Sequence, residues 1–196
     1  MEMKYLNVFF ISILAFGLII WTLIPLIQPT TQHLLSHAFI GSHQPVRQKT
    51  TNNQAYTPHP PILITSNSHF VSQGFSGSGT PNDPYRIENL NITASNGDLM
   101  SISDTTVYFC ISNNYLNGLT TTTTGISLFN VQHVKVENNS ISNNGDGIKT
   151  TNTSNAIFLN NSVYSSTRFG FFLINASNCI FKSNSIHDNL INGIHL

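Results

Sequence analysis

The feature that most constrains this chain is a short sequence repeat with a nearly constant period in its C-terminal third. A glycine opens each copy, at Gly125, Gly147 and Gly170, and a further copy begins at Gly193. Apolar residues and asparagines recur at equivalent positions within these copies. A fixed period of this kind is typical of proteins that stack one structural unit per repeat, so that each unit contacts mainly its neighbours.

Within each unit, apolar and polar residues alternate over short stretches. Ile126 and Leu128 flank Ser127, and residues 134–136 repeat the pattern. Alternation with a period of two indicates half-buried β-strands, and the intervening Asn and Gly residues indicate turns. Short strands that recur once per unit predict an all-β parallel β-helix, with about 4.8 Å between coils. We expect the following side chains to point into its core: Ile126, Leu128, Val136, Ile141, Ile148, Phe158, Val163, Phe171, Leu173, Phe181 and Ile186.

One column of the repeat consists of asparagine. Asn139, Asn161 and Asn184 occupy equivalent positions at a turn between two strands, and Asn114 stands at the same place one coil earlier. Stacked amides can bond to one another and to the turn backbone, which satisfies polar groups that burial would otherwise leave unpaired. We therefore predict a structural asparagine ladder through these four coils.

The composition favours strands and turns over helices. Asn, Ser and Thr make up about a third of the chain, whereas charged residues make up only 8%. These three residue types form helices poorly, because their side chains compete for backbone hydrogen bonds. The formal net charge is zero, so the chain has no electrostatic basis for binding nucleic acid. No Cys/His spacing indicates a metal site, and we expect no cofactor.

The N-terminal segment indicates the compartment. Residues 8–27 form an uncharged apolar run that is long enough to cross a bilayer as a helix. We predict a transmembrane anchor within residues 1–27 and place the rest of the chain outside the cytoplasm. A cleaved signal peptide, which would leave a secreted protein, is the alternative. Residues 28–60 contain four Pro and are predicted to form an extracytoplasmic polar linker, followed by the β-helix in residues 61–196.

The chain ends shortly after Gly193, which opens a new coil. That coil lacks its second half, and no polar cap follows to cover the apolar side chains of Phe181 and Ile186. We therefore expect the β-helix to be incomplete at the C-terminus, and we expect the chain to be a fragment of a longer β-helix. Docking of this end onto a second copy is the alternative.

A family resemblance rests on the stretch Gly74–Leu90, GFSGSGTPNDPYRIENL. Its GxGTxxxPY block precedes a strand, and N-x-I and G-I-x-L units with the asparagine column follow. Over residues 62–196 this combination resembles right-handed parallel β-helix repeat proteins of the periplasmic copper-binding (NosD-like) type. It also resembles the β-helix domain of carbohydrate-binding proteins and sugar hydrolases. The resemblance implies a right-handed coil, but it brings no copper site, because Met100, Cys110 and Cys179 do not form a converging ligand set.

Enzymes with this type of fold would need clustered carboxylates, as the resemblance implies. Asp146 and Arg168 lie in nearly the same turn of successive coils, and Asp188 lies in a neighbouring turn, so these three are the catalytic candidates. Asp146 and Asp188 would be about 10 Å apart along the stack, which is too far for a retaining glycosidase. Asp146 and Arg168 equally fit a solvated ion pair. No catalytic site is evident, and whether the protein is an enzyme stays open.

Outward positions of the repeat also form columns. Ser127, Lys149 and Phe172 stack on one outer face, and Ile157 and Ile180 stack on another. Exposed apolar side chains beside amides and hydroxyls suit a sugar or protein surface, although packing between coils would also explain them. The candidate binding residues are Phe172, Ile157, Ile180 and Lys149. Sequons for N-glycosylation in an exported protein occur at Asn91, Asn138, Asn152, Asn160 and Asn175.

Two functional classes follow. The first is a membrane-anchored, extracytoplasmic β-helix module that binds carbohydrate or an envelope protein, or that builds envelope structure. The second is a polysaccharide lyase or glycoside hydrolase of the β-helix type. The sequence favours the first class, because no acidic or basic cluster gathers on one face of the coils.

We predict that residues 8–27 hold the protein in the membrane. Carbonate extraction removes peripheral proteins but not a bilayer-spanning apolar helix, so the protein should stay in the pellet. A soluble product that begins near residue 39 would instead show that the segment is a cleaved signal.

Overall fold

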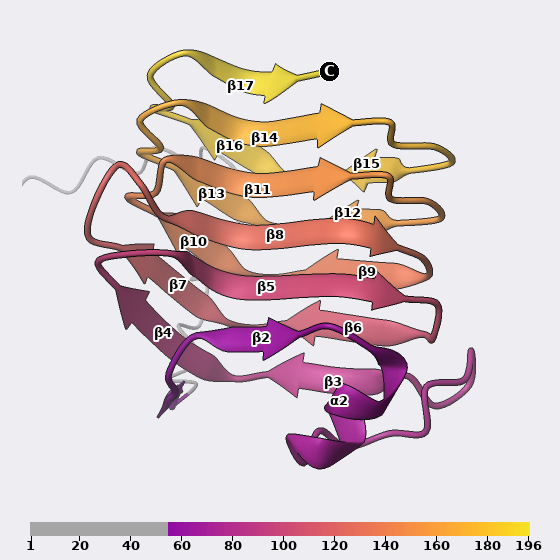
Figure 1. The fold of residues 1–196 in the computed structure, drawn as a ribbon. Coiled ribbons are helices and arrows are strands. Elements are labelled where there is room, and N and C mark those ends of the chain that lie inside the picture. Colours follow the sequence, from indigo (N-terminus) through magenta and orange to yellow (C-terminus); the bar gives the residue numbers. More distant parts are fainter. Residues whose placement is uncertain (1–54) are drawn as a thin grey trace, which may run out of the picture. The chain divides into compact units, whose positions relative to one another are not determined.

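The structure is a computed structural model that describes residues 55–196; the predicted anchor and most of the predicted linker lie outside this range. The described chain winds through three parallel β-sheets and contributes one strand to each sheet per turn (Figure 1). This is the all-β parallel solenoid that the repeat predicts. No helix within residues 55–196 is long and apolar enough to span a membrane.

Each sheet takes every third strand of the chain. Sheet A contains β1 (Thr57–Pro58), β4 (Leu90–Ala94), β7 (Tyr115–Gly118), β10 (Ser140–Ser142), β13 (Ser162–Tyr164) and β16 (Ser185–His187). Sheet B contains β2 (Ile62–Ile64), β5 (Asp98–Thr105), β8 (Thr124–Val131), β11 (Asp146–Thr151), β14 (Phe169–Ile174) and β17 (Asn192–His195). Sheet C contains β3 (Tyr85–Glu88), β6 (Phe109–Ser112), β9 (Val134–Glu137), β12 (Ile157–Leu159) and β15 (Ile180–Lys182). Because β1 pairs with β4, the sheets begin inside the segment predicted as linker.

The register of the sheets follows the sequence repeat. In sheet C the parallel ladder joins Ile87, Ile111, Val136, Phe158 and Phe181 in one inward column. The spacing between neighbours in this column is wider from Ile87 to Val136 than from Val136 to Phe181. The early coils are therefore longer than the later ones, on which the predicted period is based.

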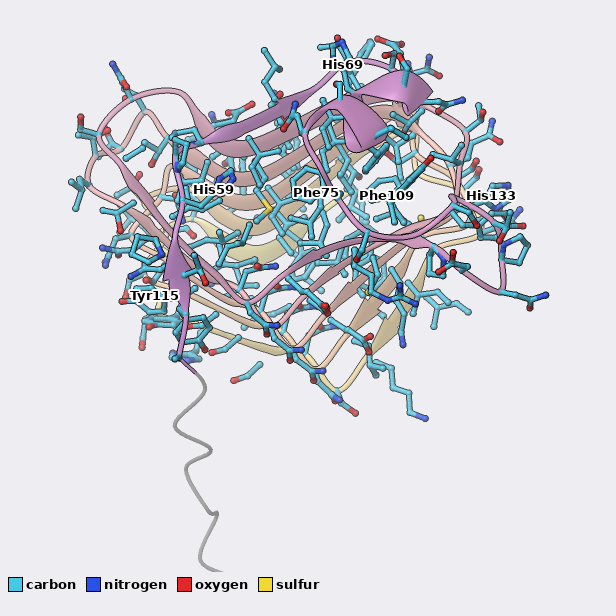
Figure 2. The ribbon with its side chains drawn as sticks, turned by 90° about the horizontal axis from the view of Figure 1, so that it is seen from below. His59, His69, Phe75, Phe109, Tyr115 and His133 are labelled. Atoms are coloured by element: carbon cyan, nitrogen blue, oxygen red, sulfur yellow. The ribbon has the colours of Figure 1, made fainter. Side chains whose placement is uncertain are left out.

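The inward columns form one apolar core along the axis of the solenoid. Every side chain predicted to point inward is buried except Phe181, which is 38% exposed, and Ile186, which is half-buried. Both belong to the last coil that contributes a strand to all three sheets, and Phe181 still stacks on Phe158 with ring centroids 4.8 Å apart. Figure 2 looks at the stack from below and shows Phe109 inside the ring of strands and Tyr115 outside it.

A short helix, α2 (Asn67–Ser72), covers the lower end of the core (Figure 1). Phe70 is fully buried, and its ring lies 4.9 Å from that of Tyr85 and 5.0 Å from that of Phe109. The Asn67 amide fixes the helix to the turn between β5 and β6, where it donates one hydrogen bond and accepts another. The sequence analysis placed these residues inside the β-helix and predicted no helix there, so α2 is a correction. Its Phe70 side chain closes the end of the apolar core.

The predicted asparagine ladder is confirmed at the turns between sheets C and A. Nδ2 of Asn114, Asn139 and Asn161 donates to Oδ1 of the next asparagine, at 3.0 Å in each case, and the last acceptor is Asn184. Each Nδ2 also donates to a carbonyl of sheet C in the preceding coil, and each Oδ1 accepts a backbone N–H. The amides of Asn114, Asn139 and Asn161 therefore join their own turns to the coils on both sides, whereas that of Asn184 bonds to the preceding coil.

We predict that Asn161→Ala lowers the free energy of unfolding by about 1–3 kcal/mol, because the buried partners of its amide lose their hydrogen bonds. Asn155→Gly is the matched control. Asn155 is exposed with a φ of 53°, a conformation that glycine adopts freely, so its change should stay within about 0.5 kcal/mol. Urea denaturation followed by circular dichroism measures both, and equal losses would contradict the ladder.

We predict that Thr150→Val raises the free energy of unfolding by up to about 1 kcal/mol, because the buried Thr150 hydroxyl has no hydrogen-bond partner. Thr153 is equally buried, but its hydroxyl donates to the Thr151 carbonyl at 3.4 Å. Thr153→Val should therefore lower the free energy by about 0.5–1.5 kcal/mol. Thermal and urea unfolding measure the pair, and a less stable Thr150→Val variant would contradict the assignment.

Candidate functional site

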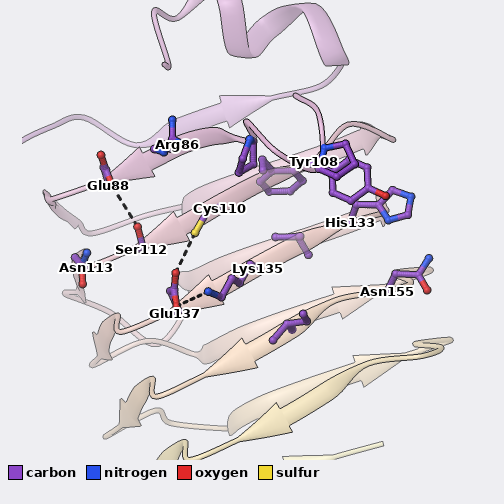
Figure 3. Close-up of a pocket in the computed structure, with 15 residues that line it drawn as sticks. Arg86, Glu88, Tyr108, Cys110, Ser112, Asn113, His133, Lys135, Glu137 and Asn155 are labelled. Carbon is purple, nitrogen blue, oxygen red and sulfur yellow. Dashed lines mark hydrogen bonds and ion pairs between the residues drawn. The ribbon is translucent and has the colours of Figure 1, made fainter. Parts of the chain in front are cut away.

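The outer face of sheet C carries a groove with a volume of about 520 Å³ (Figure 3). The groove crosses β3, β6 and β9 and reaches β12, and the turns that lead into sheet C border it. Its lining combines aromatic and aliphatic side chains with hydroxyls, amides and charges of both signs. The side chains that define its chemistry are Arg86, Glu88, Tyr108, Cys110, Lys135 and Glu137.

Strand alternation and register together build the floor of the groove. Every second residue of a strand faces outward, and parallel pairing stacks these residues into columns along the solenoid. One column runs through Arg86, Cys110, Lys135, Ile157 and Ile180; the other runs through Glu88, Ser112, Glu137, Leu159 and Lys182. Because successive residues of a column are about 4.8 Å apart, a ligand that lies along the floor contacts several coils.

The charged side chains of the floor largely neutralise one another. Lys135 Nζ lies 2.8 Å from Glu137 Oε2, and Arg86 Nη1 lies 3.3 Å from Asp83 Oδ1. Glu88 accepts a hydrogen bond from a serine hydroxyl of β6 at 3.5 Å. The floor therefore offers hydrogen-bond donors and acceptors close together, and the two cations of the lining, Arg86 and Lys135, are matched by two carboxylates, those of Glu88 and Glu137.

An aromatic pair forms one wall of the groove. Tyr108 and His133 occupy successive coils at the turns between sheets B and C, and their rings stack at 4.3 Å with an angle of 12° (Figure 3). Asn155 follows in the next coil. Both His133 and Asn155 have a left-handed φ, near 55° and 53°, which turns the chain sharply into sheet C. The wall thus places two stacked rings and an amide along the groove.

The glycine-rich block ahead of β3 shapes the end of the groove nearest α2. Gly77 has a φ of 112°, and a Cβ there would overlap the Pro84 carbonyl, so no other residue fits. The Gly79 carbonyl accepts the backbone N–H of Tyr108 at 3.0 Å. The block that carried the family resemblance therefore folds back over β3 and holds the aromatic wall.

The thiol of Cys110 lies in the floor between the charged side chains. Its Sγ donates to Glu137 Oε1 at 3.6 Å. Burial raises the pKa of the Cys110 thiol from 9.0 to about 11, and the nearby Glu137 carboxylate acts in the same direction. The thiol is therefore protonated at neutral pH and acts as a weak donor rather than a nucleophile.

The predicted catalytic candidates lie away from this groove. Arg168 Nη1 is 3.5 Å from Asp146 Oδ2, and Asp146 is only 4% exposed at the start of β11. Asp188 follows β16 and contacts His187 Nδ1 at 2.7 Å. The sequence analysis expected Asp146 and Arg168 to lie within reach of each other, and the ion pair agrees with this expectation. Neither these two residues nor Asp188 lines the groove.

The predicted binding residues are divided between two faces. Ile157 lines the groove, and Ile180 extends its column. Lys149 and Phe172 are neighbours on the outer face of sheet B, where Lys149 Nζ lies 5.9 Å from the centre of the Phe172 ring. Of the predicted binding residues, Ile157 and Ile180 therefore belong to the groove or its column, whereas Lys149 and Phe172 lie on another face.

Sequence reasoning missed Glu88, Tyr108 and Glu137 as groove residues. The outward residues of β3, β6 and β9 do form columns that could have indicated the groove. The early coils are longer than the later ones, so a repeat of constant period does not align these residues. Among the sequon asparagines, Asn91 is half-buried, and the other four are exposed. Within the described part of the chain, no three His, Cys, Asp or Glu side chains gather closely enough to hold a metal ion.

Residues 62–196 match the protein family described as "Right handed beta helix region", and the chain belongs to this family. Neither the curated proteins nor the solved structures include a match. The family description agrees with the parallel solenoid and identifies the coil as right-handed, as the resemblance implied. The finer resemblance, to the NosD-like type or to carbohydrate-active β-helix domains, stays a prediction.

We predict that Cys110 reacts slowly with iodoacetamide at neutral pH, measured in a Cys179→Ser variant by mass spectrometry. Because only the thiolate reacts, the rate should rise about tenfold per pH unit and level off only near pH 11, the pKa of the buried thiol. The urea-unfolded variant is the control and should level off near pH 9.0. A plateau near pH 9.0 in the folded protein, with its circular dichroism unchanged, would contradict the burial of this thiol.

Proposed function

We propose that this protein is a membrane-anchored β-helix module outside the cytoplasm, whose sheet C groove binds an uncharged carbohydrate chain without catalysis. The observation that carries the proposal is the lining of the groove, where ring surfaces stand beside closely spaced donors and acceptors. Sugars expose both apolar ring faces and many hydroxyls, so they match a surface of this mixture. Specificity in such sites comes from a few fixed polar groups on an otherwise apolar lining.

The ion pairs support an uncharged ligand. Lys135 is engaged with Glu137, and Arg86 with Asp83. A hydroxyl can bond to these groups while the pairs remain intact, whereas a strongly charged ligand would have to compete with them. Discrimination against charged ligands follows from this competition.

The proposed compartment rests on the sequence of residues 8–27, whose uncharged apolar side chains fit a bilayer-spanning helix. The resemblance to exported β-helix proteins supports the same compartment. An envelope protein is the alternative partner, since the outer face of sheet B offers Lys149 and Phe172 beside the partly exposed Phe129.

The second candidate function is a polysaccharide hydrolase or lyase, and one observation favours it. Glu88 and Glu137 lie in the same outward column with Ser112 between them. Two coils of about 4.8 Å separate their backbones by roughly 9.6 Å. Carboxyl groups of inverting glycosidases are about 6.5–9.5 Å apart. The backbone separation is just above this range, and side chains that point toward each other would bring the two carboxyl groups within it, so this pair merits a test of turnover.

We predict that Tyr108→Ala weakens carbohydrate binding about two- to twelvefold, because an aromatic contact contributes about 0.5–1.5 kcal/mol. Isothermal titration with cello-, xylo- and manno-oligosaccharides identifies the ligand, and oligogalacturonides supply the charged comparison. Tyr164→Ala is the matched control, since Tyr164 stacks on His187 at 5.2 Å in sheet A, outside the groove. Failure of every neutral oligosaccharide to bind, or equal losses in both variants, would contradict the proposal.

The same mixtures of protein and oligosaccharide, assayed for products, distinguish binding alone from catalysis. New reducing ends would reveal hydrolysis, and ultraviolet absorbance of unsaturated products would reveal a lyase. The proposal expects neither signal. Turnover by the unaltered protein that Glu137→Gln abolishes would establish the second candidate instead.

A further inference from the structure

The chain contains four Asn-Gly pairs, which begin at Asn96, Asn117, Asn144 and Asn192. In such a pair the backbone nitrogen of the glycine can attack the side-chain Cγ of the asparagine, because glycine has no Cβ to obstruct it. The attack needs a glycine N–H that is free of hydrogen bonds and a backbone that can rotate. These requirements separate the four pairs sharply.

Two of the pairs are held by their own hydrogen bonds. Asn144 is fully buried, its Nδ2 donates to the Ser142 carbonyl at 2.7 Å, and the N–H of Gly145 donates to the Thr123 carbonyl at 2.7 Å. Asn117 lies in β7, where its Oδ1 accepts two side-chain hydrogen bonds, at 2.8 and 3.2 Å. Neither asparagine can reach its neighbouring nitrogen without local opening.

The Asn192 pair is constrained by its strand. Asn192 is exposed, but Asn192 and Gly193 both belong to β17, whose backbone pairs in parallel with β14. An extended backbone in a ladder cannot fold over to close a five-membered ring. Of the three pairs other than Asn96, this one has the least side-chain restraint.

Asn96 and Gly97 differ from all of these. Both are exposed in the bend between β4 and β5, and no hydrogen bond engages the Asn96 amide or the Gly97 N–H within the described structure. Gly97 has a φ of 69°, and no atom lies within 4 Å of the position that a Cβ would take. The chain is fixed on both sides, because the Ser95 carbonyl accepts the Thr120 hydroxyl at 2.7 Å and Asp98 begins β5. Within this turn, the two reacting residues are therefore the ones that no hydrogen bond holds.

We propose that Asn96 is a site of spontaneous deamidation and isomerisation in the folded protein. The Gly97 nitrogen forms a bond to Asn96 Cγ and loses its proton, the Cγ–Nδ2 bond breaks, and ammonia leaves. Water then opens the cyclic imide at either carbonyl, which gives aspartate or isoaspartate. The product places a new carboxylate close before Asp98, at the corner between sheets A and B. Because Asn96 and Gly97 are exposed and no atom lies within 4 Å of a Cβ position on Gly97, the solenoid keeps its fold as this charge accumulates.

Peptide mapping by mass spectrometry tests the proposal on the full chain, purified in a mild detergent and incubated at mildly alkaline pH. Asn96 should convert at least about tenfold faster than Asn117 and Asn144, since local opening of about 1.4 kcal/mol already slows a reaction tenfold. It should also outpace Asn192. In urea the four rates should converge. Equal rates in the folded protein, or the same slowing by folding at Asn96 as at Asn144, would overturn the proposal.

A pair of product-like variants tests the tolerance of the turn. Asn96→Asp should leave the thermal midpoint of unfolding unchanged, because the side chain has no partners to lose. Asn144→Asp should lower the midpoint, because it places a carboxylate against the Ser142 carbonyl that the buried amide now bonds. A loss of stability in Asn96→Asp as large as that in Asn144→Asp would overturn the claim that the turn accommodates the product.

Discussion

The hydrogen bonds of the stacked asparagine amides hold the turns of this solenoid, and the arrangement of the coils depends on them. With only 8% charged residues, the chain has few salt bridges to order its layers, and Asp146–Arg168 is one that joins successive coils. At three of the turns between sheets C and A, those of Asn114, Asn139 and Asn161, one amide accepts a backbone N–H and donates to a carbonyl and to the next amide. Without it these groups would be buried and unpaired, at a cost of about 1–3 kcal/mol each. The ladder also fixes the register, because an amide can bond only to its counterpart one coil away.

The groove is a consequence of that register. The parallel register aligns Arg86, Cys110 and Lys135 in one column. In the adjacent column Ser112 lies between Glu88 and Glu137. The side chains stand on strands rather than on free loops, so their spacing is set before any ligand arrives. Rigid strands position polar groups more accurately than loops do. A repeating sugar chain suits a floor that itself repeats along the stack.

The constant period of the later coils made their strands and turns predictable. The helix α2 and the groove do not follow from this period and were not predicted. The columns through Ile126, Phe158 and Asn161 follow from a constant period, and the structure has them where that period puts them. The early coils are longer, so Glu88 was not aligned with Glu137. Tyr108 belongs to a stretch that does match the later units, but the sequence alone does not show that its ring stacks on His133 at the edge of a groove. The helix α2 is too short to give a periodic signal, and Phe70 closes the core through contacts that only the three-dimensional arrangement reveals. The Asp146–Arg168 contact followed from the turn positions, but the burial of Asp146 did not.

A double-mutant cycle between Asn139 and Asn161 tests the central claim most directly. The two amides share a hydrogen bond of 3.0 Å, and Asn161 also accepts the Asn139 backbone N–H. If stacked amides hold the coils together as a unit, each single change to alanine already breaks the shared bond. The double variant should then be more stable than the sum of the single losses predicts, by about 1 kcal/mol or more. Losses that add to within about 0.3–0.5 kcal/mol would show that the asparagines act independently and would contradict the account.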